Sequence, residues 1–220
     1  MAFSFPLAIA DFWDDLRISS QRFTLGENME TAETGGGEIL AARTGPRLWQ
    51  GEARIAADTS DLQDRAVAMI DLIRQPGRPF LVYDTNRAAP QTDRDGTEQG
   101  GAVCIVLAVG ADRREVAFGG LPVGFALTRG DLLSIQYGAN PTRFYLGRVV
   151  TGGVFSGGTP NFLAGVEVVP SLPEAITGSE VVTLRAPVCK AVYVPDSYSP
   201  PPRFIGSDGG LSFKWRQTLR

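Results

Sequence analysis

The residues that most often perform chemistry are scarce in this chain. It has no histidine and only two cysteines, Cys104 and Cys189, among 220 residues. Histidine is the commonest general base, and histidine and cysteine are the usual ligands of zinc. Each cysteine lies among apolar neighbours, which is typical of a small buried hydrophobic residue. The sequence therefore predicts that the protein is not an enzyme, and it indicates no catalytic, cofactor-binding or metal-binding residue.

The remaining reactive groups do not form a recognisable site. Asp14 and Asp15 are adjacent, so they point in different directions and are poorly placed to flank a glycosidic bond. The segment 93–98, Asp-Arg-Asp-Gly-Thr-Glu, resembles part of a calcium loop but lacks the later ligands, and it favours a solvated loop. A serine nucleophile would need Lys190 or Lys214 as its base, and neither follows a Ser-x-x-Lys pattern. The glycine-rich segments lack the ending of a phosphate-binding loop and are interpreted as turns.

Composition favours a soluble protein built of many short strands. The chain contains 26 glycines and 15 prolines, and its hydrophobic content of 43% is ordinary for a globular protein. A net charge of -3 does not indicate the clustered basic surface that binding to double-stranded nucleic acid requires. The first residues lack a basic signal segment, and the longest apolar run, 102–109, is too short for a bilayer. We expect a protein made in the cytoplasm without membrane insertion.

One segment has the periodicity of an amphipathic helix. From Ser60 to Gln75, apolar residues recur at helical spacing, and Pro76-Gly77 follows as a stop. Ser60 is the expected N-cap, with Gln63 reaching back to it. The sequence therefore predicts one helix that packs a single face on a sheet.

The other regular segments have the alternation and turn residues of strands. Residues 21–30 and 47–57 suggest a hairpin with a turn at 35–37, and residues 86–101 form a loop at a domain boundary. Further strands are expected at 78–84, 102–109, 115–118, 132–137, 144–150, 162–169, 180–184, 191–194 and 212–219. The Pro-rich segment 199–202 is a stiff connector or a ligand for an aromatic groove. The fold class is thus mainly β, or α+β, with strands beyond residue 101 that suit a small barrel or sandwich.

Several short phrases occur along the chain in a characteristic order. They are Phe-Ser-Phe-Pro at 3–6, Gly-Pro-Arg-Leu-Trp-Gln at 45–50, Arg-Pro-Phe-Leu-Val-Tyr-Asp at 78–84, Leu-Thr-Arg-Gly-Asp-Leu-Leu-Ser-Ile at 127–135, Phe-Tyr-Leu-Gly-Arg-Val at 144–149 and Phe-Lys-Trp at 213–215. With the single helix between the second and third, this order resembles the distal tail proteins of long-tailed, siphovirus-type phages and related prophages. The likeness spans most of the chain, without an invariant catalytic signature.

The resemblance implies a fold and a place in the virion. Residues 1–98 plus 171–220 would form a tail-tube-like β-barrel or sandwich flanked by one helix, and residues 99–170 an inserted small β-barrel-like domain. Six copies would form a ring at the tail tip that joins the tail tube protein to the baseplate hub protein. DNA would pass through the channel without specific binding. The aromatic residues Trp49, Phe80 and Trp215 are the predicted interface anchors of this ring.

Other functions stay open at this point. The chain could be a tail tube or tube-terminator subunit, since these would share the amino-terminal fold. It could also be a carbohydrate-binding module of the tail tip, in which exposed aromatics such as Tyr137 or Tyr145 contact sugars of the host surface. A cell-wall hydrolase that uses Asp or Glu alone has no specific support in the sequence.

Overall fold

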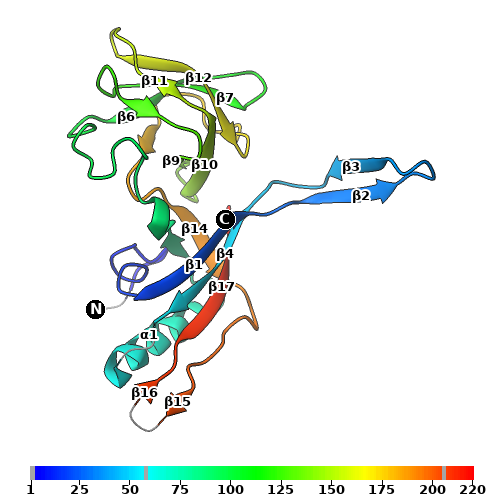
Figure 1. Ribbon diagram of the computed structural model, residues 1–220, viewed down its shortest axis with the longest axis vertical. Helices are drawn as coiled ribbons and strands as arrows, with labels where there is room; N and C mark the ends of the chain where they lie inside the picture. Colours follow the sequence, from blue (N-terminus) through cyan, green and yellow to red (C-terminus); the bar gives the residue numbers. More distant parts are fainter. Residues whose placement is uncertain (1–2, 57–58, 205–206) are drawn as a thin grey trace. The chain divides into compact units, whose positions relative to one another are not determined.

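A computed structural model describes residues 3–56, 59–204 and 207–220. Within these residues the chain is mainly β, with one α-helix and several antiparallel sheets (Figure 1). Two compact units take their residues from different stretches. Unit 1 comprises 3–13, 80–190 and 219–220, and unit 2 comprises 14–79 and 191–218. The predicted fold class is confirmed, whereas the predicted domain boundaries at 98/99 and 170/171 stay a prediction.

The first sheet has the strand order β1-β4-β17-β14-β5. Its strands are β1 (Ile18–Leu25), β4 (Trp49–Ile55), β17 (Leu211–Gln217), β14 (Cys189–Tyr193) and β5 (Phe80–Val82). β17 pairs antiparallel with β4 on one side and with β14 on the other. Every second residue of β17 is buried, from Leu211 through Phe213 and Trp215 to Gln217, as a strand with one face on a core requires. The strand nearest the carboxyl end therefore occupies the interior of this sheet.

The helix α1 (Ser60–Ile73) belongs to unit 2 and buries one stripe, formed by Gln63, Ala66, Ile70 and Ile73. The predicted helix and its apolar face are confirmed. The predicted cap is wrong. Thr59 is the N-cap and makes no side-chain capping hydrogen bond, while the Gln63 amide donates to the carbonyl oxygen of Gly209. Gln63 is oriented by burial on the sheet side of the helix, which outweighs the weaker local capping preference.

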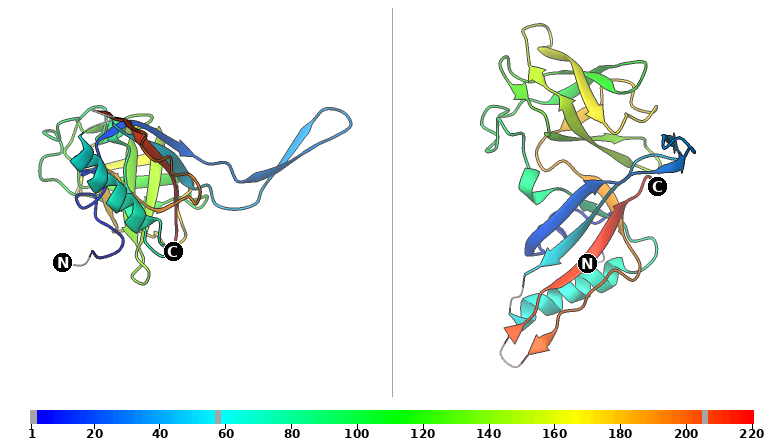
Figure 2. Two further views of the ribbon diagram at one scale, coloured as in Figure 1. Left: turned by 90° about the horizontal axis from the view of Figure 1, so that it is seen from below. Right: turned by 45° about the vertical axis from the view of Figure 1, so that its right-hand side comes forward.

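A hairpin interrupts the β1–β4 pair and extends away from it. Its strands β2 (Met29–Glu33) and β3 (Ile39–Arg43) pair with each other as a two-stranded sheet. We call residues 27–47 the arm. Both views of Figure 2 show the arm leaving the end of the β1–β4 pair. The predicted pairing and the turn at 35–37 are confirmed, but the arm as a separate hairpin was not predicted.

Unit 1 contains a closed barrel with the strand order β10-β12-β7-β6-β13-β9. Its strands are β6 (Cys104–Val109), β7 (Glu115–Gly119), β9 (Leu132–Tyr137), β10 (Arg143–Thr151), β12 (Phe162–Val169) and β13 (Val181–Thr183). Buried apolar side chains, among them Phe118, Ile135 and Val166, fill it. Closure leaves the barrel without an edge strand that could pair with another chain. The predicted strands of this region are confirmed within a few residues.

The remaining elements are short. They are the 3-10 helix η1 (Thr85–Arg87) and the strand pairs β8 (Ala126–Leu127) with β11 (Gly153–Val154) and β15 (Arg203–Phe204) with β16 (Ser207–Asp208). The segment 86–101 contains no strand, as predicted. Among the described residues, no α-helix combines the length and apolarity that a membrane span requires.

Candidate functional site

The predicted anchors Trp49, Phe80 and Trp215 are core residues of the chain itself. Each has a relative exposure of 0%. In unit 2, the ring of Phe23 lies 5.4 Å from that of Trp49 and 4.7 Å from that of Trp215, measured between centroids. In unit 1, Phe80 meets Phe12 edge to face at 4.9 Å. These rings stabilise the two cores, and their role at an interface between copies stays a prediction.

The aromatic cluster of unit 2 depends on a glycine. A Cβ on Gly51 would overlap the carbonyl oxygen of Arg22 and would lie 2.6 Å from Cζ2 of Trp215. The indole of Trp215 therefore lies directly over the backbone of β4. The backbone N–H of Trp49 donates to Oε1 of the buried Gln217, at 3.0 Å, and joins β4 to β17 beyond the regular ladder. The two tryptophans are thus held between three strands.

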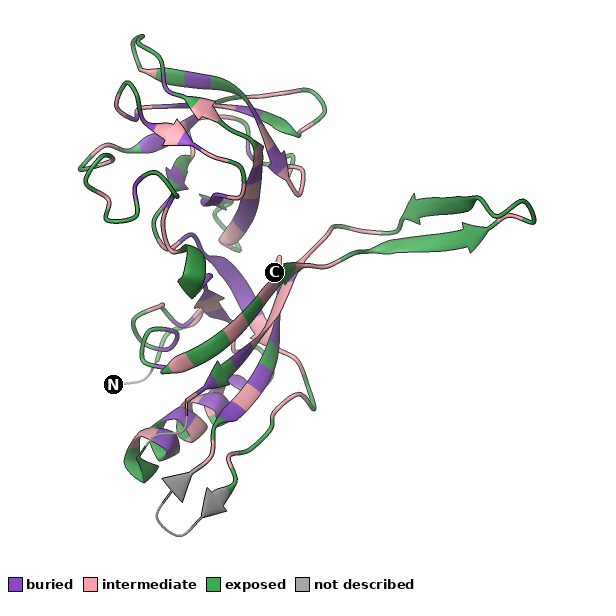
Figure 3. Cartoon of the chain, viewed as in Figure 1, coloured by how far each residue is buried: buried purple, intermediate pink, exposed green. Residues whose placement is uncertain are grey.

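The arm is the opposite case, since every residue of β2 and β3 is exposed (Figure 3). Ile39 is 74% exposed, Leu40 58% and Met29 47%. The register pairs Glu33 with Ile39 and Ala32 with Leu40, so the two large aliphatic side chains lie on opposite faces of the hairpin. Within the described ranges, no third strand pairs with β2 or β3. The arm therefore has two faces with exposed apolar residues and two unpaired edges.

The charges of the arm are mostly acidic. It has four glutamates, at 27, 30, 33 and 38, against Arg43 and Arg47. Nε of Arg43 donates to the carbonyl oxygen of Gly45 and Nε of Arg47 to that of Gly26, so both arginines bind the backbone at the base of the arm. An unpaired strand edge with apolar side chains can add to a sheet edge or lie on an apolar surface of another chain. The arm is therefore the candidate interaction site of the molecule.

Tyr137 and Tyr145 do not form an exposed sugar platform, so that prediction is wrong. Their relative exposures are 6% and 4%, and both belong to the barrel core. The Tyr145 hydroxyl donates to the carbonyl oxygen of Pro170 at 2.5 Å, and burial raises the pKa of this hydroxyl far above its ordinary value. Five of the six residues of β9 are buried, so the alternation that would place Tyr137 outside does not operate there.

The cysteines and the acidic loop have structural roles. Cys104 and Cys189 are free and buried, and burial raises the pKa of the Cys104 thiol to about 12, which leaves it protonated and unreactive at neutral pH. The carboxylate of Asp93 accepts the backbone N–H of Glu98 at 3.0 Å and that of Gln99 at 2.8 Å. Asp93 is 1% exposed, so the prediction of a solvated loop is wrong at this residue. No cluster of three metal-ligating side chains occurs in the part of the chain that the structure describes.

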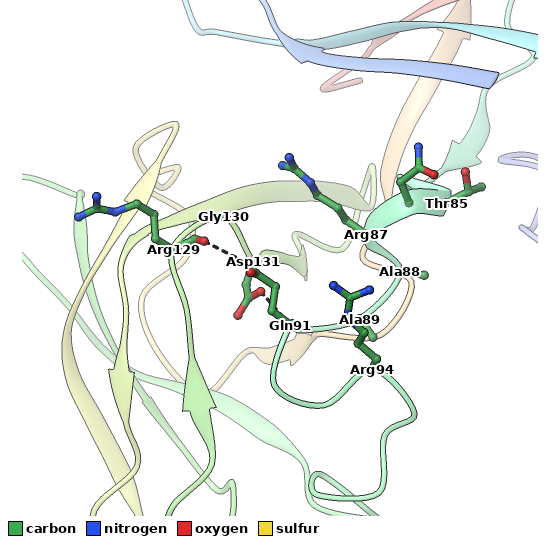
Figure 4. Close-up of a pocket in the computed structure, with 10 residues that line it drawn as sticks. Thr85, Arg87, Ala88, Ala89, Gln91, Arg94, Arg129, Gly130 and Asp131 are labelled. Carbon is green, nitrogen blue, oxygen red and sulfur yellow. Dashed lines mark hydrogen bonds between the residues drawn. The ribbon is translucent and has the colours of Figure 1, made fainter.

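A hollow of about 430 Å³ in unit 1 was not predicted from the sequence. The segment 85–94 and the turn 129–131 line it (Figure 4). The two are joined by the backbone N–H of Gln91, which donates to Oδ1 of Asp131 at 3.0 Å, and by its side-chain amide, which donates to the carbonyl oxygen of Arg129 at 2.9 Å. The lining arginines are separated by at least 35 residues in sequence between the two segments, so no local motif marked them.

No family model matches the chain, and no curated protein matches it in sequence.

Proposed function

We propose that the chain is a structural subunit of a phage tail tip, a distal tail protein of which six copies form a ring between the tail tube and the baseplate hub. The observation that carries the proposal is the exposed arm. The order of sequence phrases described above adds the family resemblance. The mainly β fold with one helix is consistent with the fold that the resemblance implies.

The physical state of the arm supports an assembly role. A two-stranded hairpin alone is marginally stable in water, and large apolar side chains exposed on both of its faces are a feature of interaction surfaces. Covering Ile39, Leu40 and Met29 against another surface would remove apolar area from water. The occupant we propose is a second copy of the chain. In a closed ring each copy offers one arm and one receiving surface, so all arms become covered.

In this role the protein acts through its interfaces. Its neighbours would be other copies, the tail tube protein and the baseplate hub protein. DNA would pass through the ring without specific contacts, which is compatible with a net charge of -3 because DNA binding requires clustered basic residues. The virion tail is the corresponding location, after synthesis in the cytoplasm of the host bacterium.

Electron microscopy of native particles, labelled with an antibody against this chain, tests the proposal. Label confined to one end of the tail, with six-fold averages of that end, is the expected result. Label along the whole tail would instead make the chain a tail tube subunit. Particles without any label would contradict a virion role.

A further inference from the structure

The hollow of unit 1 has an unusual charge for a protein with net charge -3. Three arginines line it, Arg87 and Arg94 from the segment 85–94 and Arg129 from the turn before β9. All three are exposed. In Figure 4 the side chain of Arg129 points away from those of Arg87 and Arg94. Arg129 is also held by the backbone, because its Nε donates to the carbonyl oxygen of Val150 at 2.9 Å.

The one carboxylate of the lining does not neutralise these cations. Asp131 is 3% exposed, and its Oδ2 accepts both the backbone N–H of Thr128 at 2.7 Å and the Thr128 hydroxyl at 3.0 Å. Its Oδ1 accepts the backbone N–H of Gln91. Among the residues that the structure describes, no ion pair joins Arg87, Arg94 or Arg129 to an acidic side chain. The carboxylate of Asp131 thus shapes the hollow, and the guanidinium groups give it a positive charge.

A neighbouring arginine, Arg148, is close enough to interact with the cation of Arg87. Burial is the main cause that lowers the pKa of Arg148; the cation of Arg87 lowers it further, and the carboxylate of Asp84 acts in the opposite direction. Arg148 is half-buried and lies on β10. The lining holds three arginines against the single carboxylate of Asp131, so it has an excess of positive charge that favours an anion close to Arg87.

The lining also indicates the kind of ligand. A volume of about 430 Å³ lies within the range of small-molecule sites. No aromatic side chain lines the hollow among the described residues, so a neutral sugar would lack a ring to stack on. Guanidinium groups offer planar pairs of N–H donors that match carboxylate and phosphate oxygens.

We propose that this hollow, which we call the arginine pocket, binds a small oxyanionic ligand of sugar size that carries a phosphate or a carboxylate. Arg87 and Arg94 supply the principal donors, and Arg129 adds charge at the rim. The pocket lies within unit 1 and its ligand binding does not depend on ring formation.

Calorimetric titration of the full-length protein with matched sugars tests the proposal. Glucose 6-phosphate and glucuronate carry the two candidate anions, and glucose has the same ring without charge. We expect at least one charged ligand to bind and glucose to give no heat. Comparing the two charged sugars then identifies phosphate or carboxylate as the preferred group. Binding should also weaken as salt is raised, because these side chains are exposed.

Variants locate the ligand. Arg87→Gln and Arg94→Gln each remove one cation and keep a polar side chain, and each should weaken binding about tenfold or more. Arg114→Gln is the matched control, because Arg114 is exposed and does not line the pocket. It should leave the affinity unchanged. Thermal unfolding confirms that each variant is folded.

Three results would overturn the proposal. One is equal binding of glucose and the charged sugars. The second is an equal loss of affinity in Arg114→Gln and the two pocket variants, which would indicate diffuse charge attraction. The third is the absence of binding by both charged sugars while a synthetic peptide of residues 26–48 binds and Arg87→Gln abolishes its binding. That outcome would make the pocket a docking site for the acidic arm of another copy.

Discussion

The β1–β4 pair and the arm are consecutive parts of one long hairpin. Both are paired antiparallel, yet they differ in how far their side chains are packed and buried. In the β1–β4 pair, a third strand, β17, lies beside β4, and the rings of Phe23, Trp49 and Trp215 pack together. The arm has its own ladder and no covered face. Backbone pairing is therefore common to both, and packing of side chains separates the structural part of the hairpin from the part available to a partner.

The largest effect should follow from removing the interior strand of the sheet. Deleting residues 212–220 removes β17 and leaves β4 and β14 without their shared neighbour. We expect loss of cooperative unfolding of unit 2 and an insoluble or unfolded chain, measured by circular dichroism and thermal melting. A control that ends at Gln217 retains the strand and should fold. An unchanged melting curve after the longer deletion would contradict the placement of β17.

Truncating one large apolar side chain that packs on the β1–β4 pair, and one on the arm, gives the next effect. Trp215→Ala should reduce the free energy of unfolding by about 3–5 kcal/mol, because it leaves a cavity beneath Phe23. Leu40→Ala, at an exposed position of the arm, should change it by less than about 0.5 kcal/mol. Urea titrations of the isolated protein measure both. Similar losses in the two variants would show that the arm packs within the chain.

A smaller effect is expected from adding a methyl group at a glycine of β4, compared with a glycine of the arm. Gly51→Ala places a methyl group against the carbonyl oxygen of Arg22 and the Trp215 ring, and should cost about 1–3 kcal/mol. Gly35→Ala, in the turn of the arm, meets no atom within 4 Å and should change the free energy of unfolding by less than about 0.5 kcal/mol. Urea titration measures the free energy of unfolding of both variants. A neutral Gly51→Ala would mean that Trp215 can move away from β4 at little cost.

Removing the arm should affect stability least and assembly most. The backbone N–H of Gly26 donates to the carbonyl oxygen of Leu48 at 2.8 Å, so an Asn-Gly turn can replace residues 27–47 between them. We expect the free energy of unfolding of the monomer to change by less than about 0.5 kcal/mol. Native mass spectrometry should show oligomers of the intact chain and none of the shortened one.

An exposed residue outside the arm provides the control for that experiment. Val123 is 62% exposed and lies in the barrel unit, and Val123→Ser should leave assembly intact. Oligomers that persist without the arm would contradict its proposed role between copies.

Periodicity predicted the elements of this fold well, because each has a local signature. Residues 162–169 were predicted as a strand and form β12 with those bounds, and the helix ends two residues before the predicted Gln75. The separate strands of the arm were not predicted, because 29–33 and 39–43 face solvent on both sides and have no alternation of apolar and polar residues.

Periodicity could not predict the burial of Tyr137 or the residues that line the arginine pocket. Tyr137 follows a strand pattern, but closure of the barrel buries nearly all of β9. Arg94 and Arg129 come from separate loops, which are joined by hydrogen bonds from Gln91 to the turn 129–131 and from the Thr92 hydroxyl to the carbonyl oxygen of Ala126. Both features depend on contacts between segments that are far apart in the sequence, and such contacts leave no local pattern in a single sequence.

The position of β17 has a consequence for synthesis of the protein. The strands of the barrel lie between residues 104 and 183, so all of them are synthesised before β17. The sheet of unit 2 cannot close before residue 217 has emerged, because its interior strand is made after β1, β4 and β14. Until then β4 keeps an open edge beside exposed aromatic rings, so nascent chains on one messenger are exposed to mutual pairing during this interval.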